Sequence, residues 1–251
     1  MTLDIITAHA LRPFQHGFFG RAGGASSGVF QGLNCGYGSS DQHEIVTINR
    51  SRAAAALDLP LVALKGVHQV HSARILTITD RAPAGVEADG LVTDRPGIAL
   101  SVLAADCQPV LLADAEAQVI GAVHAGWRGA LGGVLEAVLD AMEAVGAERG
   151  RIAAVIGPAI SQRAYEVGPD FLDAFLTEDD DYARFFAQGN GDRYQFDLPG
   201  FGLHRLREAG VGHAEWTRHC TYSDPERFFS YRRSVHQKEA DYGRLISVIR
   251  L

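Results

Sequence analysis

The 251-residue sequence has few cysteines, no excess of basic residues and no long apolar run. Its three cysteines are widely and irregularly spaced, which does not suit the disulfide framework of a small secreted domain. The formal net charge of -7 gives no sign of the basic face that nucleic-acid binding needs. No apolar run approaches the ~20 residues of a membrane helix, and the N-terminus has no secretory signal pattern. We therefore expect a reduced, cytoplasmic protein that acts on small molecules and binds neither nucleic acid nor membranes.

The bulk composition is that of an ordinary globular protein. Hydrophobic residues make up 47% of the chain and charged residues 21%. We expect a single domain over residues 1–251. A chain of this length buries enough core to fold without a structural metal, so a metal site in it would serve function rather than folding.

Two helices and one glycine-rich segment are expected from local patterns. Asp41 followed by Glu44 resembles a capping box and predicts a helix that runs to about Leu57. Residues 129–145 carry apolar side chains at spacings of three and four, which predicts a second helix. Eight glycines lie in residues 17–41, but the interspersed apolar side chains favour a packed loop over a flexible linker.

Several apolar or alternating runs predict strands. Residues 109–114 and 118–126 are two compact runs separated by three residues, which indicates a hairpin or adjacent strands. Residues 152–157 and 244–250 predict further strands, the second of which closes the chain. Because many strands follow one another without an intervening helix, a purely parallel doubly wound sheet is disfavoured. A mixed sheet, or two sheets covered by helices, fits the pattern better.

Three residues that can bind a metal stand at the ends of predicted strands. His71 precedes a strand, Cys107 follows an apolar strand, and His124 ends another before a glycine-rich turn. Imidazole and thiolate bind zinc well, and three protein ligands leave the fourth position that catalytic zinc keeps open. Such an ion lowers the pKa of bound water to ~7. By spacing alone the ordinary alternatives stay open, namely a buried apolar cysteine and hydrogen-bonded histidines. His68 lies close by and is interpreted as a neighbour.

Several blocks of sequence resemble one known family. These blocks are QVHS, ADGLVTD, ADCQPVLL, HAGWRG and CTYSDPERFFSYRR, preceded by GFFGRAGGASSGVFQGLN. They resemble the bacterial YfiH/laccase-domain family, whose members are called purine nucleoside phosphorylases or polyphenol oxidases. The resemblance runs from about residue 16 to the C-terminus. It implies an α/β fold of the layered α/β/β/α kind with mixed sheets, and it assigns the zinc ligands to His71, Cys107 and His124.

The resemblance also implies an activity. It implies phosphorolysis of adenosine, inosine or methylthioadenosine, with deamination of adenosine as a companion reaction and nucleoside and phosphate as partners.

Asp106 is a candidate substrate-binding group and proton shuttle, or alternatively a carboxylate that fixes His71 or His124. Arg128 begins a helix after a glycine-rich turn and could bind phosphate, or alternatively serve packing.

Two other chemistries remain open. The first is a cysteine hydrolase or amidase acting on a peptidoglycan precursor, with Cys107 as nucleophile and a histidine as base. The second is a copper polyphenol oxidase, which would need several coppers and His-x-His ligand pairs. The sequence has ten histidines and no such pair. Copper could still occupy a site of two histidines and one cysteine, because it binds these ligands more tightly than zinc does.

Overall fold

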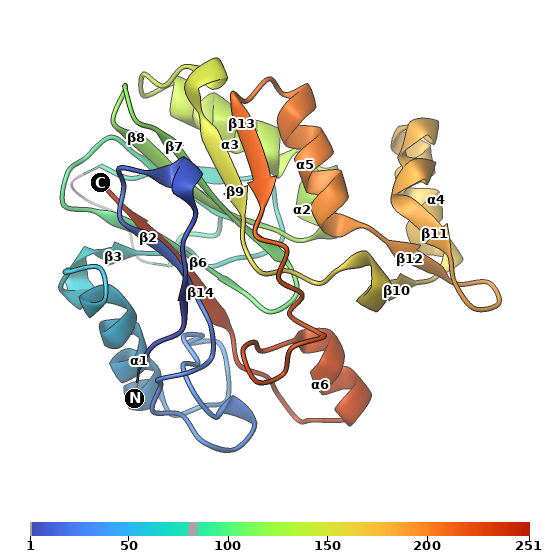
Figure 1. Ribbon diagram of the computed structural model, residues 1–251, viewed down its shortest axis with the longest axis horizontal. Helices are drawn as coiled ribbons and strands as arrows, with labels where there is room; N and C mark the ends of the chain where they lie inside the picture. Colours follow the sequence, from blue (N-terminus) through green and yellow to red (C-terminus); the bar gives the residue numbers. More distant parts are fainter. Residues whose placement is uncertain (1, 80–84) are drawn as a thin grey trace.

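Two β-sheets lie face to face in the computed structural model, which describes residues 2–79 and 85–251 (Figure 1). The strands of the five-stranded sheet are, in spatial order, β1 (Ile5–Ile6), β2 (His16–Phe19), β14 (Leu245–Arg250), β6 (Ala99–Ala104) and β3 (Leu64–Lys65). Those of the six-stranded sheet are β13 (His213–Trp216), β9 (Ala153–Ile156), β7 (Gln108–Asp114), β8 (Val119–Ala125), β5 (Gly90–Thr93) and β4 (Ile75–Thr77). Each sheet contains parallel and antiparallel pairs, so both are mixed.

The central strands carry continuous apolar runs because both faces of the six-stranded sheet are covered. In β7, Val110 and Leu112 pack toward the helices on the outer face. Leu111 and Ala113, which alternate with them, pack against the five-stranded sheet. Side chains of successive strand residues point to opposite faces, so a strand buried on both sides needs a continuous apolar run.

Helices cover the two outer faces. The helices α3 (Val134–Glu143) and α5 (Leu198–Glu208) pack on the six-stranded sheet. The helix α1 (His43–Ala55) packs on the five-stranded sheet through Ala53. The order of layers is therefore α/β/β/α, and the layered α/β fold with mixed sheets is confirmed.

The predicted hairpin is confirmed, but the single helix predicted over residues 129–145 is wrong. The strands β7 and β8 pair antiparallel along their full length. The helical region consists of α2 (Trp127–Leu131) followed by α3, with Gly132 and Gly133 between them. Gly133 has a φ of 89°, a left-handed conformation that interrupts an α-helix and that glycine adopts most easily.

The predicted capping box at Asp41 is also wrong. The helix α1 begins at His43, and the residue before it, Gln42, makes no side-chain capping bond. The Asp41 carboxylate instead accepts hydrogen bonds from Ser26 Oγ at 2.7 Å and Asn34 Nδ2 at 3.0 Å. It thereby ties two turns of the glycine-rich segment together, an interaction that local sequence spacing does not reveal.

The glycine-rich segment is packed, as predicted. Phe18, Phe19 and Leu33 are each at most 1% exposed. Gly32 has a φ of 116°, and a Cβ atom built there would lie 1.9 Å from the carbonyl oxygen of Arg21. The chain therefore approaches itself too closely at this point for any residue except glycine.

A small third sheet stands to one side of the two large ones (Figure 1). It contains β10 (Glu166–Val167), β12 (Tyr194–Phe196) and β11 (Phe186–Gln188), with α4 (Pro169–Glu178) beside it. An aromatic cluster holds it to α5, with ring centroids of Phe175 and Phe196 at 4.7 Å and of Phe175 and Phe201 at 5.1 Å. This lateral sheet forms one wall of the pocket described below.

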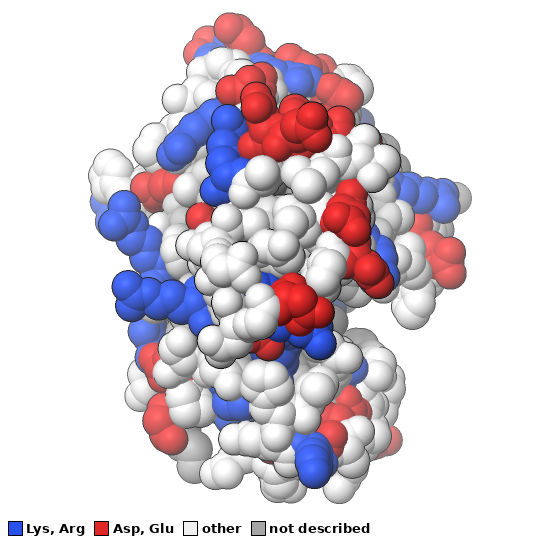
Figure 2. Space-filling view, turned by 90° about the vertical axis from the view of Figure 1, so that its right-hand side faces the viewer, with Lys and Arg blue, Asp and Glu red and all other residues white. Residues whose placement is uncertain are grey.

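The surface gives two general observations. On the side that carries α4, acidic and basic side chains are both spread over the molecule (Figure 2). Within residues 2–79 and 85–251, no helix is both long enough and apolar enough to cross a membrane.

Candidate metal centre and adjoining pocket

The fold brings His71, Cys107 and His124 together, although they are far apart in the sequence. His71 lies in the loop before β4, Cys107 directly precedes β7, and His124 lies in β8, opposite Pro109 in the β7–β8 register. One ligand atom from each residue lies within 4.8 Å of the other two. His68 is exposed and is not part of this group. We refer to His71, Cys107 and His124 as the three-ligand group.

The geometry of the three-ligand group fits a zinc ion. Cys107 Sγ lies 3.9 Å from His71 Nε2. Tetrahedral zinc with ordinary bond lengths separates a sulfur from a nitrogen ligand by about 3.6 Å. The rings of His71 and His124 meet edge to face with centroids 4.8 Å apart, so they approach a common point without stacking. Two imidazoles and one thiolate are a donor set that zinc binds well.

Electrostatics within the group favour the thiolate form of Cys107. Burial alone would raise the pKa of the thiol, but the neighbouring His124 and His71 outweigh it and bring the pKa to about 7. For His124, burial has the opposite effect and would lower the pKa, because it too favours the neutral form. The charges of Cys107 and Asp89 outweigh it and raise the pKa of His124 to about 9. Thiolate is the form that binds metals and that attacks electrophiles. The surroundings of Cys107 therefore suit a metal ligand and a nucleophile alike.

Asp89, directly before β5, organises the group from behind. Its carboxylate accepts a hydrogen bond from His124 Nδ1 at 2.9 Å and from the backbone N–H groups of Val70, His71 and Ser72. It is fully buried, yet these hydrogen bonds outweigh the burial and bring its pKa to about 2. The bond to Nδ1 leaves Nε2 of His124 available as a metal ligand. Asp89 was not among the residues predicted to form the site, although it lies in the ADGLVTD block.

The same carboxylate holds the loop of His71. This residue has a φ of 61°, an uncommon conformation for any residue other than glycine. Three successive N–H groups from Val70 to Ser72 converge on Asp89, so the loop is anchored where it is strained. Gly126, on the opposite side, leaves room for the ligands. A Cβ atom there would lie 2.8 Å from the His71 ring and 3.0 Å from Cys107 Sγ.

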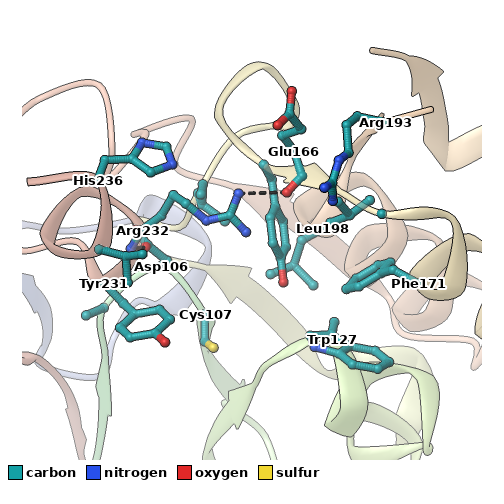
Figure 3. Close-up of a pocket in the computed structure, with 16 residues that line it drawn as sticks. Asp106, Cys107, Trp127, Glu166, Phe171, Arg193, Leu198, Tyr231, Arg232 and His236 are labelled. Atoms are coloured by element: carbon teal, nitrogen blue, oxygen red, sulfur yellow. Dashed lines mark hydrogen bonds between the residues drawn. The ribbon is translucent and has the colours of Figure 1, made fainter. Parts of the chain in front are cut away.

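A pocket of about 640 Å³ opens beside Cys107 (Figure 3). The sulfur of Cys107 lies at its base, with Tyr231 on one side and Trp127 and Phe171 on the other. The ring centroids of Trp127 and Phe171 are 4.5 Å apart. Tyr165 also lines this aromatic wall. The volume is in the range of sites that take small molecules, and flat aromatic walls suit a planar ring system.

Two arginines line the part of the pocket away from Cys107 (Figure 3). Arg232 donates through one terminal nitrogen to the carbonyl oxygen of Glu166 at 2.6 Å, and its guanidinium lies over the Tyr165 ring. Among the described residues, its remaining nitrogens have no hydrogen-bond partner. Arg193 is half exposed, and its one ionic neighbour in the described part of the chain is Asp192, at 3.6 Å. The pocket therefore offers unsatisfied guanidinium donors on the same side as its aromatic wall.

Arg128, which was expected to contact phosphate, lies outside the pocket beside Cys107. It is exposed, and its guanidinium lies over the Trp127 ring at 4.4 Å from the centroid. It lines a separate shallow hollow with Glu178 and Arg205 and does not line the pocket beside Cys107. Trp127 lines both hollows. Arg232 lines the pocket beside Cys107 and Arg128 does not, so the geometry favours Arg232 as the phosphate-binding arginine.

Of the two roles considered for Asp106 from the sequence, the structure contradicts the one in which its carboxylate fixes His71 or His124. Its carboxylate bonds to Thr221, Ser230 and the backbone of Arg232, and it makes no hydrogen bond with His71 or His124. The histidine partner is Asp89 instead. Burial raises the pKa of Asp106, while the three donors around it favour the ionised form.

Comparison with known proteins assigns the chain to a family. Residues 15–251 match the family described as multi-copper polyphenol oxidoreductase laccase. A purine nucleoside phosphorylase of Deinococcus radiodurans is 39% identical over 243 residues, which cover 94% of this chain and 88% of that protein. The purine nucleoside phosphorylase YfiH of Escherichia coli is 36% identical over 229 residues, with 91% and 90% covered. The crystal structure of a Neisseria meningitidis protein matches with a TM-score of 0.90 at 33% identity, covering 100% of this chain and 99% of that one. The chain therefore belongs to the YfiH family of laccase-domain proteins.

Proposed function

We propose that the protein is a zinc-dependent purine nucleoside phosphorylase that also deaminates adenosine. The observation that carries this proposal is the pocket itself, which joins a three-ligand metal group, aromatic walls and free guanidinium donors in one space. The names of two relatives, from Deinococcus radiodurans and Escherichia coli, support a reaction of this class. Adenosine, inosine and methylthioadenosine are the proposed substrates, with inorganic phosphate as the second one.

The residues of the pocket would divide the substrates between them. The rings of Trp127, Phe171 and Tyr165 would pack against the purine, which is flat and apolar on both faces. Arg232 would bind phosphate, because a guanidinium offers two parallel N–H donors that match two phosphate oxygens. The three-ligand group would hold zinc, which supplies Lewis acidity when bound. Cys107 places that group at the base of the pocket.

The first prediction compares two arginines. Arg232→Ala is expected to raise the KM for phosphate by about 10-fold to 100-fold, since a hydrogen bond to a charged group is worth about 1.5–3 kcal/mol. Arg232→Lys should restore only part of the affinity, because the bidentate fork is lost. Arg128→Ala is the matched control and should leave the KM nearly unchanged. Steady-state kinetics with varied phosphate measure the KM of all three variants. A rise in KM confined to Arg128→Ala would show that Arg128, and not Arg232, binds phosphate.

The second prediction concerns the reaction. With phosphate, the protein is expected to convert inosine and adenosine to the free base and ribose 1-phosphate. Without phosphate, adenosine should yield inosine and ammonia with the glycosidic bond intact. Removal of the metal by a chelator should suppress deamination in particular, and added zinc should restore it. Chromatography of the bases and an ammonia assay separate the two reactions. If metal-replete protein forms neither product from adenosine, inosine or methylthioadenosine, the nucleoside proposal fails.

A second candidate is a cysteine hydrolase or amidase. The observation that favours it is the contact of Cys107 Sγ with His71 Nε2 at 3.9 Å, within reach of a base. A peptidoglycan precursor is the substrate class considered for it. Alkylation of the thiol would stop such an enzyme, whereas a chelator would leave it active.

The copper oxidase alternative has less support. Across the described parts of the chain, one group of three metal-capable residues is present. Relay of four electrons to oxygen needs several coppers and a correspondingly larger set of ligands. The family description refers to multi-copper proteins, but the donor set in this chain suits one ion.

A further inference from the structure

Asp106 joins the three-ligand group to the opposite wall of the pocket. It lies between β6 and β7, directly before Cys107, and its side chain is almost completely buried. One carboxylate oxygen, Oδ1, accepts a hydrogen bond from Thr221 Oγ1 at 2.6 Å. The other, Oδ2, accepts from Ser230 Oγ at 2.9 Å and from the backbone N–H of Arg232 at 2.6 Å. All three donors come from one segment near the C-terminus.

This segment leads into α6 (Tyr231–Gln237), which forms a wall of the pocket. Ser230 is the N-cap of α6, since its hydroxyl oxygen accepts from the N–H of Arg233 at 3.1 Å. The first two residues of the helix, Tyr231 and Arg232, and His236 further along point toward the pocket (Figure 3). The Asp106 carboxylate therefore connects the start of α6 to the residue before Cys107, in addition to the bonds that Arg232 makes to Glu166 and that Arg233 makes to Thr221.

The backbone at Asp106 also reflects this arrangement. Its φ of 87° is uncommon outside glycine, although aspartate and asparagine tolerate it better than most residues. The carbonyl oxygen of Asp106 accepts from the N–H of Ile160 at 2.9 Å. Bonds on both the main chain and the side chain thus hold a conformation that the isolated residue disfavours.

We propose that Asp106 is a positioning residue, which holds α6 over Cys107 and so sets how tightly the pocket binds its substrate. This proposal rests on the proposed function only for the identity of that substrate. Both oxygens are engaged by these donors, so a proton on Oδ2 would face the N–H of Arg232, and a proton on Oδ1 would require the Thr221 hydroxyl to rotate. A group in these surroundings is poorly suited to carry protons to and from a substrate.

Two substitutions separate positioning from proton transfer. In Asp106→Asn, the amide oxygen can accept from Ser230 and Arg232 while the NH₂ group faces the Thr221 hydroxyl, which can rotate to accept. This variant keeps the hydrogen bonds and the tolerance of positive φ, but it cannot act as an acid or base. Asp106→Ala removes all three bonds. Asp106→Asn should therefore retain kcat and KM within about threefold, whereas Asp106→Ala should raise KM by about 10-fold or more with a smaller change in kcat.

Hydrogen exchange gives a readout that does not depend on turnover. The amide protons of α6, above all that of Arg232, should exchange faster in Asp106→Ala and at the wild-type rate in Asp106→Asn. Zinc content should be the same in both variants and in the wild type. If Asp106→Ala does not fold, Thr221→Val removes the donor to Oδ1 and leaves the N-cap of α6 intact, and it should raise both KM and α6 exchange to a smaller extent.

The outcomes are distinct. Loss of kcat in Asp106→Asn with unchanged α6 exchange would show proton transfer by Asp106 and overturn the proposal. Wild-type exchange of α6 in Asp106→Ala would overturn it as well. If the wild-type protein turns over no nucleoside, the proposed function fails, while the exchange comparison still decides whether Asp106 fixes α6.

Discussion

Cys107→Ala is expected to lose both the bound metal and turnover. Elemental analysis of the wild-type protein should find about one zinc per chain, as a three-ligand site predicts. His71→Ala should lose the metal too, because two remaining ligands hold zinc poorly. Cys220→Ala is the matched control. Cys220 is also a free, partly buried cysteine, but it lies outside the three-ligand group, so its replacement should leave metal content unchanged.

Alkylation then distinguishes a metal ligand from a nucleophile. Zinc-loaded protein should resist iodoacetamide at Cys107, because the thiolate electrons are engaged by the metal, and chelated protein should react. A cysteine hydrolase would behave differently, since chelated protein would retain turnover until it was alkylated. Peptide mass spectrometry identifies the modified cysteine in each case. Full retention of zinc by both Cys107→Ala and His71→Ala would refute the three-ligand group as the metal site.

The strand pattern predicted mixed sheets covered by helices, whereas the α/β/β/α order of layers was implied by the family resemblance. Apolar runs such as residues 109–114 are long enough to cover both faces of a strand, which is what a sheet buried on two sides requires. The helix over residues 129–145 was predicted too long because its apolar spacing continues through Gly132 and Gly133. The left-handed conformation of Gly133 is a backbone choice that this periodicity does not report.

The grouping of His71, Cys107 and His124 could be predicted from residue type and from the family resemblance, whereas the hydrogen bonds around these residues could not. His71, Cys107 and His124 could be named because few other side chains bind zinc. The partners of Asp106 and Asp89 could not be read from the sequence. Thr221 lies 115 positions from Asp106 and His124 lies 35 from Asp89, so the hydrogen bonds exist only after folding. Arg232 was likewise overlooked because its place in the pocket depends on how α6 is held.

Asp89→Asn is expected to weaken zinc binding by about 10-fold to 100-fold, the usual cost of losing the partner of a metal-binding histidine. The two oxygens of Asp89 cannot be replaced by an amide without conflict. Oδ1 accepts from the N–H of His71 at 3.0 Å, and Oδ2 accepts from the N–H of Ser72 at 2.6 Å. Whichever way the amide turns, its NH₂ group meets a backbone donor that cannot reverse. Asp106→Asn differs, because there one oxygen faces only a hydroxyl.

The orientation of the new amide decides how the loss arises. If its NH₂ group takes the place of Oδ1, it donates to His124 Nδ1, and the ring then carries its proton on Nε2, the nitrogen needed for the metal. If it takes the place of Oδ2, the loop from Val70 to Ser72 loses its anchor and His71 moves. Competition with a chromogenic chelator measures the zinc dissociation constant, and melting of the metal-free protein separates lost affinity from lost stability. Asp94→Asn is the control, because Asp94 is partly exposed and its one ion pair within the described residues is with Arg95. Equal zinc affinity in Asp89→Asn, Asp94→Asn and the wild type would show that Asp89 does not position the ligands.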